Sequence, residues 1–276
     1  MLAFPNCKIN LGLRVLRKRP DGYHDIESVF LPIPIHDVLE VISRPSSSPG
    51  SIDMQFGEGI QIPGPDENIC TKAYRLVQKN IPELPAISAF LFKTIPVGAG
   101  LGGGSSDGVA MLKLLNEKFR LNLDEGTLYQ LALELGSDCP FFLRNTVAYA
   151  TGRGEVLEPI NLDLTGLYVV LINPGIHINT GWAFKNLQPA PSASVLSAIA
   201  RPVSEWKNNL TNDFEPGVFD AHPEIAVIKE SLYRQKALYA SLTGTGSTVY
   251  GLFETPPLID HLFPSHYFTR VIEIVQ

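Results

Sequence analysis

The order of predicted strands and helices along this chain indicates an α+β fold. Strand-like and helix-like segments follow one another without the regular strand–helix alternation of a doubly wound parallel sheet. Of the 276 residues, 45% are hydrophobic and 18% are charged, which is the composition of an ordinary globular protein with ample apolar side chains for a core. A chain of this length corresponds to one large domain or two smaller ones.

The first third of the chain has the patterns of several strands and one helix. Between Cys7 and Val15 the apolar residues occupy every second position, which is the period of a strand with one buried face. The run Arg19-Pro20-Asp21-Gly22 predicts a turn, so residues 1–45 are expected to form strand, turn and strand. The segments predicted next are short strand-like pieces within 45–64, a helix over 66–79 and a strand over 88–95.

The rest of the chain continues this mixture. A helix is expected to begin at Asp124, a good N-terminal cap, and to end at Gly136. The polar stretch 185–209 has mixed helix and loop character. The other predicted elements are a helix over 105–119, a strand over 166–172, helix within 212–235, a strand pair within 239–253 and a short strand over 272–275. A polar loop before the strand at 166 predicts a domain boundary, which divides the chain into 1–157 and 158–276.

The loop from Gly98 to Ser106 is the most informative feature of the sequence. It contains five glycines and two serines, and an apolar helical pattern follows at once. Glycines let the backbone approach a ligand closely, and the helix adds the positive end of its dipole. These properties predict a phosphate site and therefore a protein that uses a nucleotide. A flexible linker of similar composition is the alternative, but a linker would not run directly into a helix.

Two other known phosphate loops fit this segment less well. A Walker loop needs a lysine where Gly104 stands. The dinucleotide fingerprint is formally matched by Gly98, Gly100 and Gly103, with Asp124 downstream. However, Pro96 and its neighbour separate the loop from the preceding strand, and we expect no βαβ unit around it.

Charge and cysteine content limit the partners of this chain. The formal net charge is −6, so nucleic acid and anionic membranes are poor expectations, and small molecules are favoured. The three cysteines are far apart, without the spacing of a metal site, and fit a reducing cytosol. No secretory signal or membrane-spanning pattern is recognised, so a cytoplasmic location is expected. The sequence does not indicate the oligomeric state.

Lys8 and Asn10 project from the same face of the first strand. They are either on the solvated face of an edge strand, or Lys8 supplies a fixed positive charge to a phosphoryl group or a carboxylate. Further along, Tyr23 and His24 directly follow the Asp-Gly turn. Either they simply follow a hairpin turn, or their rings bind a nucleobase by stacking and hydrogen bonding.

Three further features have both a structural and a functional interpretation. Asp138 either caps the short helix expected after it or accepts the proton of an attacking alcohol. The glycine-rich segment 242–247 is either a bend between strands or a backbone that approaches bound phosphates. Asn68 is either an ordinary helix cap or an adenine contact, and Lys93 is either an exposed strand lysine or part of the nucleotide site.

These segments resemble the three motifs of the GHMP kinases, a family of small-molecule kinases. Pro96 to Ser106 is similar to the phosphate-binding motif of the family, in the triple-glycine form of a branch whose substrate is a cytidylyl sugar alcohol. Pro5-Asn6-Cys7-Lys8-Ile9-Asn10-Leu11 is similar to the P-x-A-K-[IL]-N-L opening of that branch, with Cys7 in place of alanine. The run from Lys18 to His24 matches its cytidine signature, and Leu242 to Ser247 matches the third motif.

The resemblance implies a two-lobed fold with the active site in the cleft between the lobes. It also implies direct transfer of a phosphoryl group from ATP, by Lys8 and Asp138 as catalytic residues, with Mg²⁺ held largely by phosphates and water. The ATP-binding residues would be Pro96, Val97, Gly98, Ala99, Gly100, Leu101, Gly102, Gly103, Gly104, Ser105, Ser106 and Asn68. The substrate-binding residues would be Asn10, Tyr23, His24, Thr180, Phe184 and Gly244, with Trp182 as an alternative to Phe184. A serine of the loop is left as the alternative direct contact of the metal, and no other residue is assigned to it.

Overall fold

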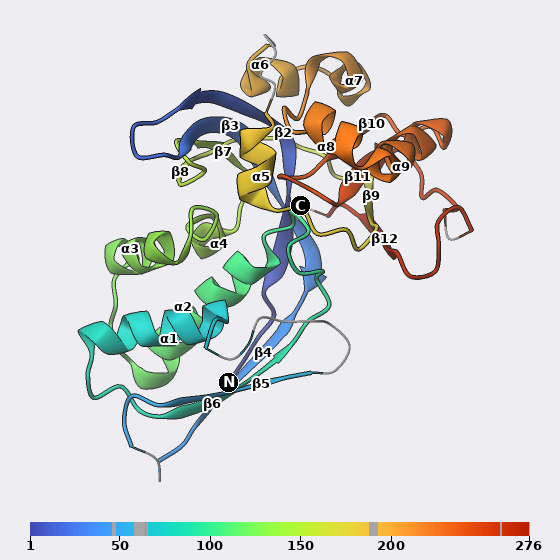
Figure 1. The fold of residues 1–276 in the computed structure, drawn as a ribbon. Helices are drawn as coiled ribbons and strands as arrows, with labels where there is room; N and C mark the ends of the chain where they lie inside the picture. The colour runs from blue at the N-terminus through green and yellow to red at the C-terminus, as the bar shows by residue number, and fades with distance from the viewer. Residues whose placement is uncertain (46–47, 58–63, 65, 188–192, 260, 276) are drawn as a thin grey trace. The chain divides into compact units, whose positions relative to one another are not determined.

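The computed structural model describes residues 1–45, 48–57, 64, 66–187, 193–259 and 261–275. Within these ranges the chain forms three four-stranded sheets and several helices (Figure 1), which confirms the predicted α+β class. The chain divides into two compact units, which are described separately below. Unit 1 comprises Met1–Cys7, Pro34–Val97 and Gly102–Thr146, and unit 2 comprises Lys8–Ile33, Gly98–Leu101 and Val147–Gln276. The functional division at residue 157 stays a prediction.

The sheet of unit 1 has the strand order β1-β4-β6-β5. Its strands are β1 (Leu2–Ala3), β4 (Val38–Ser43), β5 (Ile52–Phe56) and β6 (Ile87–Phe92). Strands β5 and β6 are parallel and are connected through α1 (Ile69–Asn80). This βαβ unit ends before the loop begins, so the expectation that no βαβ unit surrounds the loop is confirmed. The helix after the loop leads to another helix, so the dinucleotide interpretation still lacks its following strand.

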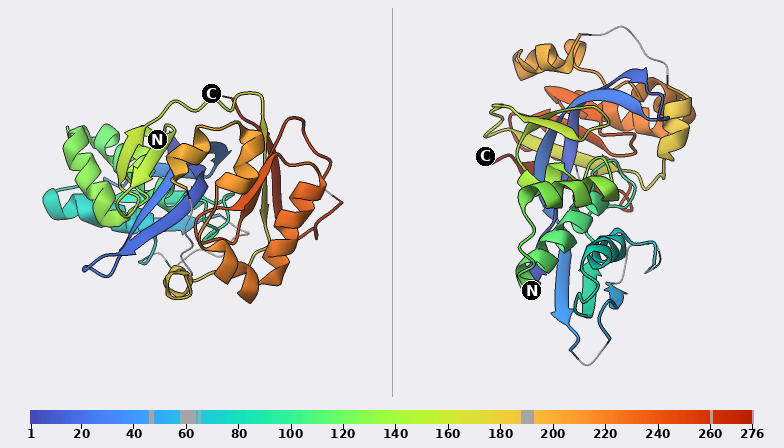
Figure 2. Two further views of the ribbon diagram at one scale, coloured as in Figure 1. Left: turned by 90° about the horizontal axis from the view of Figure 1, so that it is seen from above. Right: turned by 90° about the vertical axis from the view of Figure 1, so that its left-hand side faces the viewer.

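Three helices of unit 1 pack together beside this sheet, as both views of Figure 2 show. They are α1, α2 (Gly103–Phe119) and α3 (Glu125–Leu135). The bounds of α3 confirm the prediction, since Asp124 accepts a hydrogen bond from Thr127 N at 2.7 Å and Gly136 ends the helix. Helix α2 begins two residues earlier than predicted, directly after Gly102, which has a left-handed backbone.

Unit 2 contains two further sheets, with the orders β2-β3-β7-β8 and β10-β11-β9-β12. The first is built from β2 (Asn6–Lys18), β3 (His24–His36), β7 (Ala148–Thr151) and β8 (Val156–Pro159), although β2 and β3 extend at one end into unit 1. The second is built from β9 (Tyr168–Asn173), β10 (Tyr239–Leu242), β11 (Val249–Phe253) and β12 (Phe268–Glu273). The prediction placed the last strand at 272–275. It missed the true start because β12 is an edge strand with largely exposed side chains.

The helices of unit 2 surround an apolar core. They are α5 (Thr180–Lys185), α6 (Val195–Ile199), α7 (Trp206–Asn209), α8 (Glu215–Ala221) and α9 (Pro223–Arg234). Trp206, Tyr239 and Tyr250 are almost completely buried and contact one another edge to face, with ring centroids 5.7 and 5.9 Å apart. Of the predicted mixed stretch 185–209, residues 188–192 lie outside the described ranges, and the remainder contains short helices as expected.

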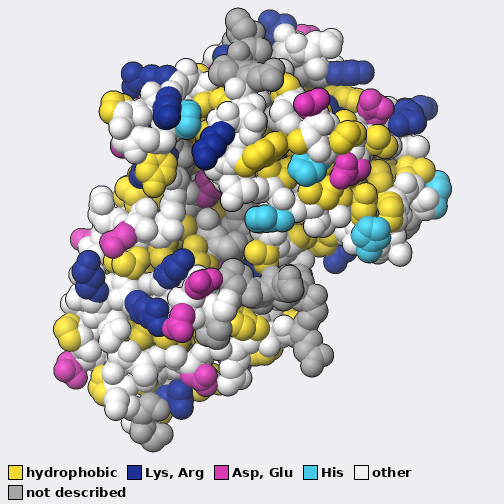
Figure 3. All heavy atoms as spheres, viewed as in Figure 1, with side chains coloured by type: hydrophobic (Ala, Val, Ile, Leu, Met, Phe, Trp, Pro, Cys, Tyr) yellow, Lys and Arg dark blue, Asp and Glu magenta, His cyan; other side chains and the backbone are white. Residues whose placement is uncertain are grey.

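Acidic and basic side chains are interspersed on the face of the protein in Figure 3, where neither sign forms a continuous band among the described residues. On this face an anionic ligand would meet local groups rather than a broad positive surface. No helix within the described ranges has the length and apolar character needed to cross a membrane.

Candidate active site

The glycine-serine loop has the backbone conformation that its composition predicts. Gly98, Gly100 and Gly102 have φ values of 65°, 77° and 68°, a region that side chains with a Cβ rarely adopt. Ala99 and Leu101 are buried between them. Residues Gly98–Leu101 are counted with unit 2, whereas Pro96, Val97 and Gly102–Ser106 are counted with unit 1.

In unit 2 the loop lies directly against the third motif. An ideal Cβ on Gly100 would stand 2.1 Å from the Thr243 carbonyl oxygen, and one on Gly244 would stand 3.2 Å from Gly100 Cα. The Thr243 hydroxyl donates a hydrogen bond to the Gly100 carbonyl at 3.1 Å and accepts one from Asn10 N at 3.0 Å. Two backbones meet here at a distance that only glycine permits, which explains why both motifs are rich in glycine.

Lys8 is joined to the same loop and is 3% exposed, so the interpretation of Lys8 as a solvated edge lysine is wrong. Its backbone N–H donates to the Leu101 carbonyl at 2.9 Å. Its ammonium donates to Asn10 Oδ1 at 2.6 Å and lies 4.3 Å from the centre of the Phe30 ring. Asn10 is also buried, and its side-chain amide donates to Ser28 Oγ at 3.0 Å. Unit 2 therefore presents a buried, oriented ammonium beside the glycine loop.

In unit 1, Asp138 lies between α3 and α4 (Phe141–Arg144) and is partly buried. The N-cap position of α4 is occupied by Pro140 rather than by Asp138. The neighbouring Cys139 is hydrogen-bonded to the side chain of Ser105, and burial raises the pKa of its thiol to about 12. This contact joins the first turn of α2 to Cys139, the residue that directly follows Asp138.

The aromatic residues predicted to bind a base are partly assembled in unit 2. The rings of His24 and Phe184 stack, with centroids 4.6 Å apart and planes 16° apart. Tyr23 is 54% exposed, and the guanidinium of Arg153 lies 4.7 Å from its ring centre. Burial, with a smaller effect of Lys18, lowers the pKa of His24. Its imidazole is therefore neutral near neutral pH and offers one donor and one acceptor.

The two candidates on α5 face different neighbours. Phe184 contacts His24, whereas Trp182 meets His222 edge to face at 6.1 Å. This arrangement favours Phe184 over Trp182 as the stacking residue. Thr180 is the exposed first residue of α5, directly after its cap.

The remaining candidates lie in unit 1. Asn68 caps α1, since its Oδ1 accepts a hydrogen bond from Cys70 N at 2.8 Å, and it is 4% exposed. Its predicted adenine contact is not tested by this bond. Lys93 is buried beside Asp37 and Asp107, so the interpretation of Lys93 as an exposed strand lysine is wrong.

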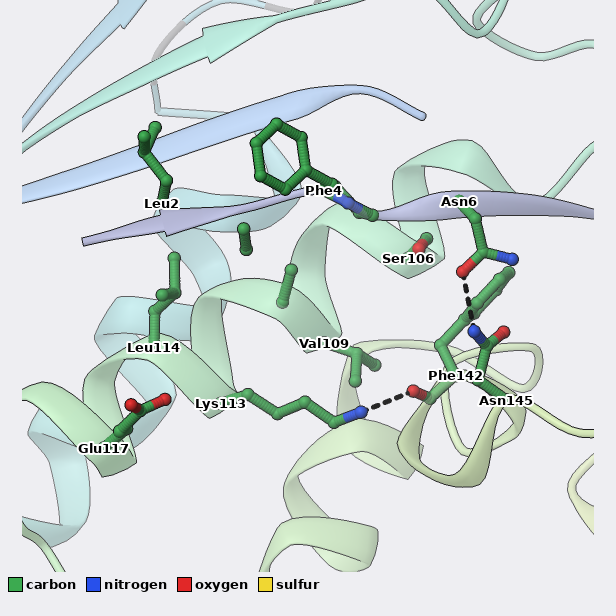
Figure 4. Close-up of a pocket in the computed structure, with 13 residues that line it drawn as sticks. Leu2, Phe4, Asn6, Ser106, Val109, Lys113, Leu114, Glu117, Phe142 and Asn145 are labelled. Atoms are coloured by element: carbon green, nitrogen blue, oxygen red, sulfur yellow. Dashed lines mark hydrogen bonds between the residues drawn. The ribbon is translucent and has the colours of Figure 1, made fainter. Parts of the chain in front are cut away.

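Unit 1 also contains a cavity of about 300 Å³ beside α2. Figure 4 shows it between the first residues of the chain and the helix face that carries Val109 and Lys113. Among its lining residues, Ser106 alone comes from the glycine-serine loop. The Lys113 ammonium donates to the carbonyls of Phe142 and Leu143 at 2.8 and 2.9 Å. Because backbone carbonyls already engage this cation, the cavity is a weaker candidate for a phosphate than the loop.

Sequence reasoning did not identify three further neighbours of the site. The His177 ring approaches Gly98, whose ideal Cβ would lie 3.0 Å from Nδ1. The Asn212 amide donates to the carbonyls of Leu242 and Gly244 at 2.8 and 2.9 Å. Arg153 covers Tyr23. These residues lie outside any recognisable motif, so only the folded chain brings them to the site.

Comparison with known proteins agrees with this geometry. Residues 68–145 match the family GHMP kinases N terminal domain, and residues 195–262 match GHMP kinases C terminal. The chain is 50% identical over 256 residues to the 4-diphosphocytidyl-2-C-methyl-D-erythritol kinase of Bacteroides thetaiotaomicron, covering 92% of both chains. It is 46% identical over 272 residues to the enzyme of that name from Azobacteroides pseudotrichonymphae, covering 97% of this chain and 100% of the relative.

A solved structure gives the same result. The crystal structure of 4-(cytidine 5'-diphospho)-2C-methyl-D-erythritol kinase matches with a TM-score of 0.78 and 30% identity, over 93% of this chain and 91% of that chain. The matched family models and these relatives identify the chain as an ATP-dependent small-molecule kinase of the GHMP class. Within that class, the chain belongs to the 4-diphosphocytidyl-2-C-methyl-D-erythritol kinase family.

The contact between Gly100 and Thr243 predicts a difference between two glycines of the loop. Gly100→Ala should lower the free energy of unfolding by about 2 kcal/mol or more, because the new Cβ meets a backbone oxygen and φ is positive. Gly104→Ala is the matched control, since its Cβ would meet nothing within 4 Å. It should leave stability unchanged or raise it by about 1 kcal/mol, because alanine favours the helix. Urea denaturation measures both, and equal losses would contradict the assignment.

Proposed function

We propose that this protein transfers the γ-phosphoryl group of ATP to the 2-hydroxyl of 4-diphosphocytidyl-2-C-methyl-D-erythritol, a step in non-mevalonate isoprenoid precursor biosynthesis. The observation that carries the proposal is the 50% identity, over 92% of both chains, to a relative that is named for this substrate. The neighbouring rings of His24 and Phe184, both partly exposed, also support it, because a base can stack on an aromatic face that is turned away from their mutual contact.

The loop from Pro96 to Ser106 is proposed to bind the ATP phosphates. Its glycines bring backbone N–H groups close to an anion, and α2 contributes the positive end of a helix of 17 residues. Asn68, at the start of α1, is proposed to lie near the adenine. The bonds from Lys8 N and from the Thr243 hydroxyl to loop carbonyls support this role, since they leave the loop little freedom to rearrange.

Lys8 and Asp138 are proposed as the catalytic pair. The 2-hydroxyl oxygen forms a bond to the γ-phosphorus while the bond from that phosphorus to the ADP oxygen breaks, and the hydroxyl proton passes to the Asp138 carboxylate. In a loose transition state the proton leaves late, so Asp138 mainly orients the alcohol. The buried Lys8 ammonium stabilises charge on the transferred group, and the Asn10 amide holds it in place.

Mg²⁺ is proposed to accompany ATP, where it neutralises phosphate charge. Within the described ranges, no three His, Cys, Asp or Glu side chains gather into a group able to hold a metal ion. We propose that the ion is bound mainly by phosphate oxygens and water, as is usual for magnesium at nucleotide sites. We also propose a cytoplasmic location, supported by three buried cysteines, all within the described ranges, that form no disulfide.

The cytidine of the substrate is proposed to bind against Tyr23, His24 and Phe184. The neutral imidazole of His24 can both donate to and accept from a base edge. Asn10, Thr180 and Gly244 are proposed to contact other parts of the substrate. Two alternatives are another GHMP kinase that acts on a different alcohol, and a non-catalytic nucleotide-binding protein of the same fold.

Release of ADP tests the proposed function directly. Turnover is measured with ATP and magnesium, in parallel reactions with the cytidylyl alcohol, homoserine or mevalonate. We expect release that depends on the cytidylyl alcohol and is at least about 100-fold slower with the other two alcohols, because neither has a base to bind. Turnover of homoserine or mevalonate at a similar rate would favour another GHMP kinase, and ATP binding without any turnover would favour the non-catalytic alternative.

Asp138→Asn tests the catalytic carboxylate. We expect kcat to fall by about 100-fold or more, with both KM values changed only a few-fold, because the amide still fills the site but cannot accept the proton. The melting temperature is measured in parallel, so that a loss of activity is not mistaken for a loss of folded protein. Asp163→Asn, in a turn of unit 2, is the control and should keep full activity. If Asp138→Asn kept kcat within a few-fold of wild type, the proposed mechanism would be wrong.

The base site is tested by two substitutions on α5. Phe184→Ala should raise KM for the cytidylyl alcohol by about tenfold or more, because base–aromatic stacking contributes about 1–3 kcal/mol, and should leave KM for ATP unchanged. Trp182→Ala is the matched control and should change neither value, because its ring faces His222. Tyr23→Ala removes an exposed ring and should act like Phe184→Ala without a loss of stability. Equal effects on both KM values would reject the stacking assignment.

A further inference from the structure

A buried cluster of three charged residues lies in unit 1. The side chains of Lys93, Asp37 and Asp107 are 3%, 0% and 2% exposed. The Lys93 ammonium pairs with Asp37 and lies 2.7 Å from Asp107 Oδ2. Charges so far from water persist only when they hold each other in place, and removal of one partner from such a group is strongly unfavourable.

The cluster connects the two ends of the glycine-serine loop. Lys93 precedes Pro96 by three residues, and Asp107 directly follows Ser106. Their ion pair therefore joins the chain just before the loop to the chain just after it, and we call this place the neck of the loop. Asp37 Oδ1 also accepts hydrogen bonds from the backbone N–H groups of Thr94 and Ile95, at 2.6 and 2.9 Å. These two bonds fix the backbone just before the loop. The bond from the Lys93 ammonium to Asp107 fixes the chain just after it.

The packing at the neck is equally close. An ideal Cβ on Gly103 would stand 2.7 Å from Ile95 Cγ2 and 3.4 Å from Lys93 Nζ. Gly103, the first residue of α2, therefore packs closely against the Lys93 ammonium. Any movement of Lys93 would have to move the start of this helix, which carries loop residues proposed to bind phosphate.

The cluster contains one more acid than base. The other titratable groups that face it are Cys70 of α1 and Cys7 of β2. Burial raises the pKa of both thiols, that of Cys7 to about 12, so neither carries charge near neutral pH. Two ionised carboxylates and one ammonium would leave an unbalanced negative charge at the neck of a loop that must accept an anion.

Asp107 is the member of the cluster that relieves this imbalance by protonation. Its Oδ1 has no hydrogen-bond partner among the described residues. Burial, together with the Asp37 charge and against the effect of Lys93, raises the pKa of Asp107 to about 7. Its carboxyl is therefore neutral below this pH and ionised above it.

We propose that the cluster of Lys93, Asp37 and Asp107 is a clasp that holds the loop in its ATP-binding conformation and sets the charge at its neck. Lys93 and Asp107 act as positioning residues through the loop backbone. The inference rests on the proposed binding of ATP by this loop, and it adds that ATP binds more tightly when the clasp carries the extra proton. Because an Asp107 charge would repel the phosphates, affinity for ATP should fall as the pH rises through 7.

Binding of ATP with magnesium, measured by titration calorimetry between pH 6 and pH 8, tests the clasp without any need for turnover. Asp107→Asn keeps an oxygen that can accept the Lys93 bond but cannot ionise. ATP itself ionises in this pH range, and this affects both proteins equally. Dividing the wild-type Kd by the Asp107→Asn Kd at each pH cancels that contribution. We expect this ratio to rise by about threefold or more from pH 6 to pH 8, which is the effect of one charge nearby. A ratio that stays constant with pH would overturn the proposed charge effect.

Asp107→Leu tests the mechanical part of the clasp, because leucine has a similar volume and cannot accept the Lys93 bond. We expect its Kd for ATP to rise by about tenfold or more, the effect of one lost charge-assisted hydrogen bond. Lys113→Met is the matched control, since it removes a partly buried lysine of the same helix that bonds away from the loop, and it should leave the Kd unchanged. Equal Kd values for Asp107→Leu and wild type would overturn the clasp.

The two proposals fail in different ways. If ATP binds and responds to Asp107 as expected while the cytidylyl alcohol gives no ADP, the clasp stands and the substrate assignment fails. If the alcohol is phosphorylated, while the Kd for ATP is the same in wild type and in the Asp107 variants at every pH, the substrate assignment stands and the clasp fails. Should Asp107→Leu not fold, the pH profile of Asp107→Asn still decides the case.

Discussion

The close approach of Gly100 to the backbone of Thr243 and Gly244 is the constraint on which the site in unit 2 depends. It brings the loop against the third motif, and the Thr243 hydroxyl then bonds to both the loop and β2. The bond from Lys8 N to the Leu101 carbonyl completes this arrangement from the same strand. Strand, loop and third motif therefore share one set of hydrogen bonds, so a displacement of any one of them would move the buried ammonium of Lys8.

The parts of this structure that depend on local chemistry could be predicted from the sequence. Asp124 and Gly136 delimit α3 because capping and helix termination need only neighbouring residues. The left-handed glycines of the loop follow from composition in the same way. The start of α2 could not be placed from propensity, because glycine disfavours helices, yet Gly103 is the first residue of α2 and lies close to Ile95.

Burial of charge is the main feature that the sequence could not supply. The alternating pattern of β2 indicates that Lys8 and Asn10 share a face, but it does not say that this face is covered. Asp37 lies 56 residues from Lys93 and belongs to no motif, so nothing in the chain links it to the loop. In both cases the information lies in contacts between distant segments, which periodicity within one element cannot reveal.

The two buried lysines next to the loop differ in the segments that hold them. The Lys93 ammonium pairs with Asp37 and with Asp107, which directly follows the loop. The Lys8 ammonium donates to the Asn10 side chain of the same strand, and Asn10 N in turn donates to the Thr243 hydroxyl. The position of Lys93 therefore depends on the residues that flank the loop, whereas the position of Lys8 depends on the strand and the third motif against which the loop packs.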